Sequence, residues 1–298
     1  MTFGIVEFST LAATFEEDLA AYAGAGIDAI GICELKLEAG REGEQLDALR
    51  QSGLATGCAI PAVPSILPAP ALPDPDGPAE RIEAICAGMR RLAPFEPTAF
   101  VCLTGPAGRL DEAEARRVVV EGLRTVASEA ERLGIPVGVE PMSARFRDDW
   151  TLITTLAETA DLIDEAGSEM LGITFDTWHL WDTPDVEREI GRHADRILCV
   201  HVADWRVPTR GWCDRALPGE GAADLASIRT ALDAAGWDGC YELEIFSDNG
   251  TFGDRYEDSL WDIPADALAY RGREAFLSGF RPTEPGDVIA ALREEEHS

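Results

Sequence analysis

The chain of 298 residues contains a single lysine, Lys36, so nearly all of its 25 basic residues are arginines. Catalysis through a lysine Schiff base is therefore excluded unless Lys36 carries it. The sequence has no apolar run near the roughly 18 residues of a membrane span. It also lacks a basic N-terminal region followed by a small-residue cleavage site. These absences predict a cytoplasmic protein with no membrane partner.

Positive charge and paired cysteines are scarce as well. The 55 acidic and 25 basic residues give a formal net charge of −30 at pH 7. Such a charge repels phosphate backbones, so we do not expect nucleic acid as a partner. The seven cysteines include no C-x-x-C pair, and five of them lie in apolar runs. This pattern favours buried, reduced thiols over a disulfide framework or a zinc site.

What the sequence does contain is eight short apolar runs that alternate with longer helical patterns. Nearly continuous apolar runs bounded by Gly, Pro or Asp are typical of buried parallel strands. No glycine-rich phosphate turn follows the first run, and eight alternating units favour a closed barrel over an open sheet. We predict an α/β fold, a single (β/α)8 TIM-barrel domain over residues 1–298, with 282–298 as a C-terminal tail. The expected strands are 4–8, 28–33, 55–60, 99–103, 136–141, 171–177, 196–202 and 240–246.

Four polar residues stand at or near the C-terminal ends of successive expected strands, namely Glu140, Asp176, His201 and Glu244. Their spacings of 36, 25 and 43 residues each suit one strand–helix unit, so a barrel would aim all four into its mouth. Three carboxylates and one imidazole are costly to bury unpaired, and we therefore expect one bound divalent metal ion. Oxygen-rich coordination favours Mn²⁺, with Mg²⁺ or Co²⁺ as alternatives, over a thiolate-preferring ion.

The runs VGVEP, FDTWH, HVADW, LPGEG and YELEIF resemble the xylose isomerase-like TIM barrels of the sugar phosphate isomerase/epimerase family. The resemblance extends over nearly the whole chain and is strongest from residue 136 to 247. It implies that the four polar residues are the metal ligands. It also implies that Glu140 and Glu244 form the catalytic acid/base pair, one on each side of the substrate. His179, three residues after the aspartate, would bind substrate near the metal.

Arginine and tryptophan side chains are further candidates for substrate contact. The resemblance implies a substrate-binding arginine in the long loop after the seventh strand, where Arg206, Arg210 and Arg215 compete for the role. Six of the seven tryptophans follow the last four strands, Trp178 and Trp205 among them. Flat aromatic faces suit the C–H faces of a sugar. Packing of lid loops, or contact with a homo-oligomer or small partner subunit, would explain them equally well.

Together these features predict a divalent-metal-dependent sugar isomerase or epimerase. It would act on a small sugar or keto-sugar by proton transfer through an enediolate. Glu220, in LPGEG, opposes a phosphate at the following helix and favours an unphosphorylated substrate. The alternative is a metal-dependent lyase of the dehydratase or C-deglycosidase type on a keto-sugar, keto-inositol or C-glycoside. A DNA-repair endonuclease would need more histidines, and a non-enzymatic binding subunit would have no reason to keep four ligands.

Overall fold

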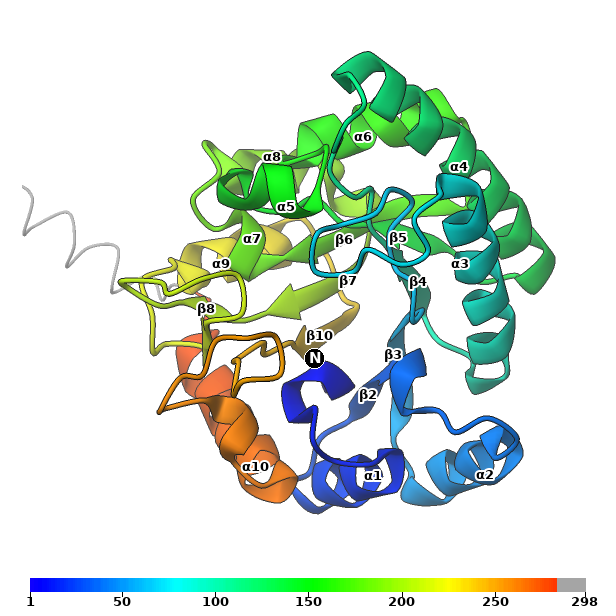
Figure 1. The fold of residues 1–298 in the computed structure, drawn as a ribbon. Helices are drawn as coiled ribbons and strands as arrows, with labels where there is room; N and C mark the ends of the chain where they lie inside the picture. The colour runs from blue at the N-terminus through cyan, green and yellow to red at the C-terminus, as the bar shows by residue number, and fades with distance from the viewer. Residues whose placement is uncertain (283–298) are drawn as a thin grey trace, which may run out of the picture.

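A computed structural model describes residues 1–282 and shows one closed barrel of parallel strands surrounded by helices (Figure 1). The strands follow one another around the barrel in the order β1, β10, β7, β6, β5, β4, β3, β2. This arrangement confirms the predicted (β/α)8 fold. Residues 283–298 of the predicted tail lie outside the described residues.

The barrel strands coincide with the eight predicted apolar runs, but several are shorter than expected. The predicted strands 136–141 and 240–246 end at Val139 and Leu243. Glu140 and Glu244 therefore follow their strands directly instead of closing them. The barrel strands are β1 (Thr2–Val6), β2 (Ala29–Cys33), β3 (Ala55–Ile60), β4 (Ala99–Cys102), β5 (Val137–Val139), β6 (Leu171–Asp176), β7 (Ile197–Val202) and β10 (Cys240–Leu243).

Several helices begin and end at capping residues, as α4 shows. Asp111 accepts a hydrogen bond from the Glu114 amide at the start of α4, and Gly134 ends that helix at a φ of 71°. A positive φ of this size favours glycine, which lacks the Cβ that would clash. The helices are α1 (Phe15–Gly24), α2 (Glu42–Ser52), α3 (Pro78–Leu92), α4 (Glu112–Leu133), α5 (Arg147–Trp150), α6 (Leu156–Ala166), α7 (Thr177–Leu180), α8 (Val186–His193), α9 (Leu225–Ala234) and α10 (Ala265–Gly279). Short 3-10 turns cover Glu7–Thr10, Glu34–Lys36, Ala93–Phe95, Ala144–Phe146, Ala194–Arg196 and Leu260–Asp262.

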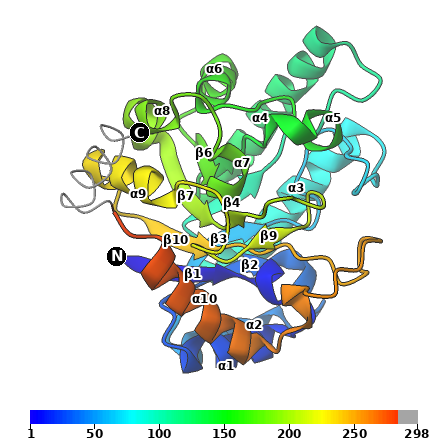
Figure 2. The ribbon, with the colours of Figure 1, turned by 90° about the vertical axis from the view of Figure 1, so that its left-hand side faces the viewer.

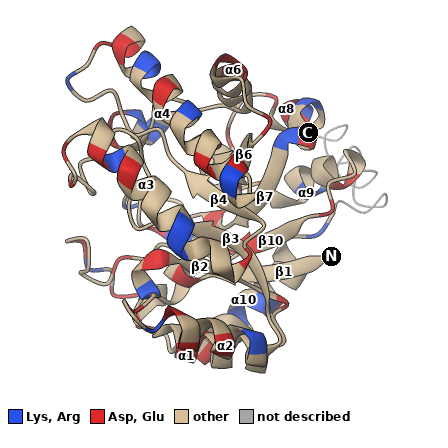
Figure 3. Ribbon diagram, turned by 90° about the vertical axis from the view of Figure 1, so that its right-hand side faces the viewer, with Lys and Arg blue, Asp and Glu red and all other residues tan. Residues whose placement is uncertain are grey.

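Charge and apolar surface are separated between the two layers. Acidic and basic residues gather on the outer helices, whereas the strands carry few of them (Figure 3). Because the strands carry few charges, a charged group inside the barrel has an apolar background.

Helices α1, α2 and α10 lie together along one side of the barrel (Figure 2). Within the described residues, no helix is both long and apolar enough to cross a membrane.

Two long connections at the C-terminal ends of the strands shape the barrel mouth. The proline-rich segment between β3 and α3 is irregular, and Arg81 of α3 anchors it. The buried Arg81 guanidinium donates to the carbonyls of Ser65, Leu72 and Pro75 at 2.7–3.0 Å. The connection after β7 contains a two-stranded antiparallel ribbon, β8 (Asp204–Trp205) and β9 (Arg215–Ala216). This ribbon fixes the position of the Arg215 backbone, from which its side chain extends.

Candidate metal centre and active site

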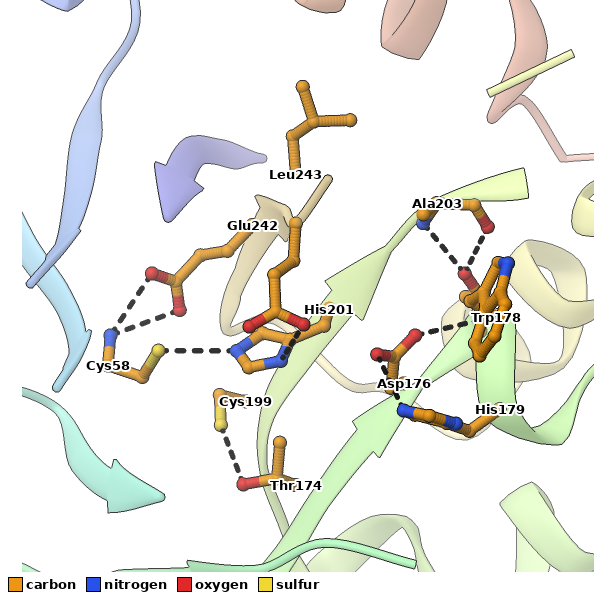
Figure 4. Close-up of polar contacts among 12 residues, drawn as sticks. Cys58, Thr174, Asp176, Trp178, His179, Cys199, His201, Ala203, Glu242 and Leu243 are labelled. Atoms are coloured by element: carbon orange, nitrogen blue, oxygen red, sulfur yellow. Dashed lines mark hydrogen bonds and ion pairs between the residues drawn. The ribbon is translucent and has the colours of Figure 1, made fainter. Parts of the chain in front are cut away.

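The four predicted ligands converge at the mouth of the barrel. Each offers one ligand atom, and these atoms all lie within 4.8 Å of one another. None of the four side chains belongs to a residue more than 5% exposed. We call this set the ligand cluster: Glu140, Asp176, His201 and Glu244. Asp176 and His201 are drawn in Figure 4.

The strand register explains why the cluster forms. Asp176 is paired with His201 across β6 and β7, and His201 is paired with Glu242 across β7 and β10. Side chains two residues apart on a strand point to the same face. Glu244, two residues beyond Glu242, therefore enters the barrel mouth one layer above it. The cluster is thus a consequence of parallel strands ending at one rim.

Arg215 extends from β9 into the same cluster. Its Nη1 lies 2.8 Å from Asp176 Oδ2 and 2.9 Å from Glu244 Oε2. Its Nη2 lies 3.3 Å from Nε2 of His179. The guanidinium is buried, so its charge is poorly screened by solvent. One guanidinium faces three carboxyl groups, so a further positive charge could be balanced in the cluster.

The donor set fits a divalent cation. His201 Nδ1 is buried without a hydrogen-bond partner and lies 3.5 Å from Glu244 Oε2. This contact with Glu244 is longer than an ordinary hydrogen bond, so the buried ring nitrogen leaves hydrogen-bonding capacity that a metal ion could use. Three carboxylates and one imidazole nitrogen match the hard and borderline divalent ions. The cluster could therefore hold one such ion.

Burial and neighbouring charges shift the pKa values of the two glutamates in opposite directions. Burial raises the pKa of Glu140 well above its usual value, and the nearby charge of Glu244 raises it further. Burial also acts on Glu244, but the charges of His201 and Arg215 outweigh it and lower the pKa of Glu244 to about 2. The same pairing with Glu244 overcomes burial and raises the pKa of His201. Metal binding would need the proton of His201 to leave.

His179 borders the cluster from α7. Its Nδ1 accepts a hydrogen bond from the Ser143 amide at 3.3 Å. Its Nε2 lies 3.8 Å from Asp176 Oδ2, beside the Arg215 guanidinium. Burial and the charge of Arg215 lower the pKa of His179 well below its ordinary value. The lowered pKa favours the neutral imidazole form of His179 next to the ligand cluster.

The other predicted substrate contacts, Trp178, Trp205 and Arg206, surround the cluster without lining its cavity, although the Trp178 amide donates to Asp176 Oδ1 at 2.8 Å. Trp178 is fully buried with the Arg215 guanidinium 5.0 Å from its ring centre, and Trp205 packs on it at a centroid distance of 4.7 Å. Arg206 forms ion pairs with Asp214 and Asp258. These three residues do not line the cavity described next, so their substrate roles remain predictions.

A cavity of about 190 Å³ opens on the cluster. Glu140, His179, Arg215 and Glu244 supply its polar lining, and the other fourteen of its eighteen lining residues are apolar. A larger hollow of about 590 Å³ lies beside α1 and residues 261–266. It shares no lining residue with the cluster, so of these two cavities the smaller one is the candidate substrate site.

A second buried polar group lies one layer below the cluster. The Cys58 amide donates to both carboxylate oxygens of Glu242 at 3.1 and 3.0 Å (Figure 4). Cys58 Sγ lies 3.2 Å from Nε2 of His201. A Cβ added to Gly57 would lie 2.1 Å from Glu242 Oε1. Sequence reasoning did not single out Glu242, although its spacing of two residues from Glu244 predicts side chains that point the same way in an extended segment.

The comparisons with known proteins agree with this architecture. The model of the xylose isomerase-like TIM barrel matches residues 19–273. The chain belongs to this family. This confirms the resemblance predicted from the motifs.

Related proteins include enzymes with different reactions. A D-psicose 3-epimerase of Enterocloster bolteae is 26% identical over 163 residues, which cover 53% of this chain and 50% of the epimerase. A 3-dehydroshikimate dehydratase of Pseudomonas putida is 27% identical over 141 residues, 44% of this chain and 21% of the dehydratase. The chain thus spans about half the length of one relative and a fifth of the other. A crystal structure of a Sinorhizobium meliloti protein aligns with a TM-score of 0.82 and 28% identity, over 94% of this chain and 98% of that one.

Proposed function

We propose that the chain is a divalent-metal-dependent isomerase or epimerase that transfers a proton beside the carbonyl of a small sugar or keto-sugar. The observation that supports this most is the ligand cluster of three carboxylates and one imidazole, which opens to a cavity. A bound Mn²⁺, Mg²⁺ or Co²⁺ would supply Lewis-acid stabilisation of negative charge on the substrate oxygen. The chain itself supplies ligands, proton carriers and a site shielded from solvent.

Glu140 and Glu244 are proposed as the proton carriers. Both are buried and line the cavity, and their opposite pKa shifts favour a protonated Glu140 and an ionised Glu244 in the metal-free protein. A pair of groups with separated pKa values can serve as acid and base in one reaction. His179 and Arg215 are proposed to bind the substrate oxygens, because both donate or accept at the edge of the cavity.

A lyase is the second candidate, and the dehydratase relative favours it. Removal of a proton beside a carbonyl begins both reactions. They differ in whether a leaving group then departs from the neighbouring carbon. The proposed roles of Glu140 and Glu244 are the same in either case.

The test is proton exchange with solvent. The purified chain, loaded with Mn²⁺, is incubated with a panel of keto-sugars in D₂O and the products are followed by NMR. We expect deuterium at the carbon beside the carbonyl, and a rate at least about 10²-fold lower in Glu140→Gln and Glu244→Gln. Glu220→Gln, an exposed surface change, is the control.

Three outcomes separate the candidates. Deuterium incorporation with an isomeric product supports the isomerase or epimerase. Incorporation accompanied by loss of water or an aglycone assigns the chain to the lyases. Complete retention of the substrate hydrogen over many turnovers contradicts proton transfer. Asp176→Asn and His201→Ala should abolish tight Mn²⁺ binding, and full metal occupancy in these variants would contradict the ligand assignment.

A further inference from the structure

The cavity beside the ligand cluster has a predominantly apolar lining. We define its apolar wall as six residues that four different strand–helix connections contribute: Ile60, Leu72, Leu103, Met142, Trp150 and Trp212. Ile60, Leu103, Met142 and Trp150 belong to a small hydrophobic cluster separate from the main core, and Leu72 and Trp212 pack against that cluster. Trp150 and Trp212 meet edge to face with ring centres 4.9 Å apart. The wall is therefore packed and continuous.

The polar lining of the cavity is confined to the catalytic end. Glu140, His179, Arg215 and Glu244 are the polar residues among those described as lining it. A free ketose carries a hydroxyl on nearly every carbon. Hydroxyls pushed against the apolar wall would lose their hydrogen bonds to water and find no side-chain partner. The wall thus opposes a fully hydroxylated chain or ring.

The size of the cavity limits the apolar group that a substrate could carry in place of a hydroxylated chain. Its volume is about 190 Å³. An engineered cavity of roughly 150 Å³ lined by similar residues binds benzene. An apolar group of about one ring, attached to a short polar head, would fill this space.

We propose, on the basis of the function proposed above, that the substrate is a sugar-like hydroxyketone that carries an apolar, ring-sized group next to its reacting carbons. The carbonyl and hydroxyl oxygens face the ligand cluster, His179 and Arg215. The apolar group lies against Trp150, Trp212 and Met142. Polar recognition is thereby concentrated on the reacting end, and the wall selects the remainder by shape and by exclusion of water.

The test compares ligands that share one head group. Hydroxyacetone, erythrulose and 2-hydroxyacetophenone all carry an α-hydroxyketone, with a methyl, a hydroxylated chain or a phenyl ring attached. Binding to the full chain loaded with Mn²⁺ is measured by titration calorimetry, so turnover is not needed. We expect 2-hydroxyacetophenone to bind at least about tenfold more tightly than either of the others, because its ring is removed from water. Acetophenone, which lacks the hydroxyl, should bind more weakly than 2-hydroxyacetophenone.

A substitution in the apolar wall tests whether the preference for the phenyl ligand arises at this site. Met142→Gln keeps the length of the side chain but adds an amide to the wall, and should reduce the preference for the phenyl ligand at least about threefold. Leu277→Gln makes the same kind of change on the outer helix α10, where Leu277 is 39% exposed, and should leave the preference unchanged.

The outcomes distinguish this inference from the function on which it rests. Equal or tighter binding of erythrulose, no measurable binding of 2-hydroxyacetophenone at millimolar concentration, or an unchanged preference in Met142→Gln would each overturn the inference. Mn²⁺ binding and solvent exchange with ordinary sugars would still support the proposed function in those cases. Tight, Met142-dependent binding of the phenyl ligand without any solvent exchange would instead support the apolar substrate and contradict proton transfer.

Discussion

Replacing Arg215 by methionine should destabilise the metal-free protein and make it more dependent on metal. The guanidinium lies 2.8 Å from Asp176 Oδ2 and 2.9 Å from Glu244 Oε2, and all three groups are buried. Removing one partner of a buried ion pair costs about 3–5 kcal/mol, because it leaves uncompensated charge. Domains unfold with a free energy of about 5–15 kcal/mol, so the loss is a large fraction of the total. The midpoint of thermal unfolding in EDTA should fall by on the order of 10 °C.

A divalent ion should reverse much of this loss. An ion at about 1,000 times its Kd stabilises the folded state by about 4 kcal/mol. In Arg215→Met, Asp176 and Glu244 no longer divide their oxygens between a guanidinium and the ion. The Mn²⁺-induced rise in unfolding temperature should therefore be larger in the variant than in the wild type. Thermal unfolding with EDTA and with a Mn²⁺ series measures both quantities in one experiment.

Arg206 provides a matched control in the same connection. Its partner Asp214 also accepts from Arg210 Nε at 2.9 Å, so Arg206→Met leaves no buried carboxylate without a cation. We expect a change within about 1 kcal/mol, comparable to a partly exposed ion pair. The reasoning is refuted if Arg215→Met unfolds in EDTA as the wild type does, or if Mn²⁺ stabilises it less than the wild type.

Three further predictions concern buried groups around the barrel. Gly57→Ala should destabilise the protein by about 1–3 kcal/mol in urea denaturation, because the new Cβ would lie 2.1 Å from Glu242 Oε1. Lys36→Met should cost about 3–5 kcal/mol in the same assay, since it removes the ion-pair partner of the fully buried Asp18. Burial raises the pKa of Glu140 in the folded state, so the metal-free protein should become more stable as the pH falls from 7 to 5. The Mn²⁺-loaded protein should become less stable over the same range, because the metal ligands must stay deprotonated.

Controls for these changes are available in the chain. Gly43, in α2, has open space where a Cβ would be added, so Gly43→Ala should stabilise by roughly 0.5–1 kcal/mol. The double change Asp18→Asn with Lys36→Met should recover part of the loss caused by Lys36→Met alone. A destabilised Gly43→Ala, a double variant no better than the single one, or identical pH trends with EDTA and Mn²⁺ would contradict the corresponding argument.

The barrel could be predicted from sequence because its strands are buried on both faces. Such strands are continuous apolar runs, and the glycines after the helices separate them clearly, as Gly134 does after α4. Strand ends were less predictable. Apolar and polar residues continue past the last ladder pair in GVEP and LEIF, whereas the hydrogen-bonded strands end at Val139 and Leu243. The end of a strand depends on its neighbours' register, which one strand's sequence does not contain.

The choice among the three arginines of the connection after β7 could not be made from sequence. Arg206, Arg210 and Arg215 have the same side chain and lie within ten residues of one another. The structure separates them through Asp214, which pairs with Arg206 and Arg210 outside the cluster and leaves Arg215 to enter it. Asp214 is adjacent to Arg215 in the sequence, but the direction in which its side chain points depends on the β8–β9 ribbon. Loop geometry, more than residue type, decides this contact.

Glu242 was missed for a reason that lies in the closure of the barrel. Its position two residues before Glu244 indicates an inward-facing side chain, and His201 of the adjoining strand β7 lies beside it. Its hydrogen-bond donor is the Cys58 amide of β3, which is separated from β10 by both β1 and β2. The missing Cβ of Gly57 makes room for the carboxylate, and the Cys58 amide satisfies it. A contact across the barrel interior exists only once all eight strands have closed, so no pattern within one strand–helix unit could have revealed it.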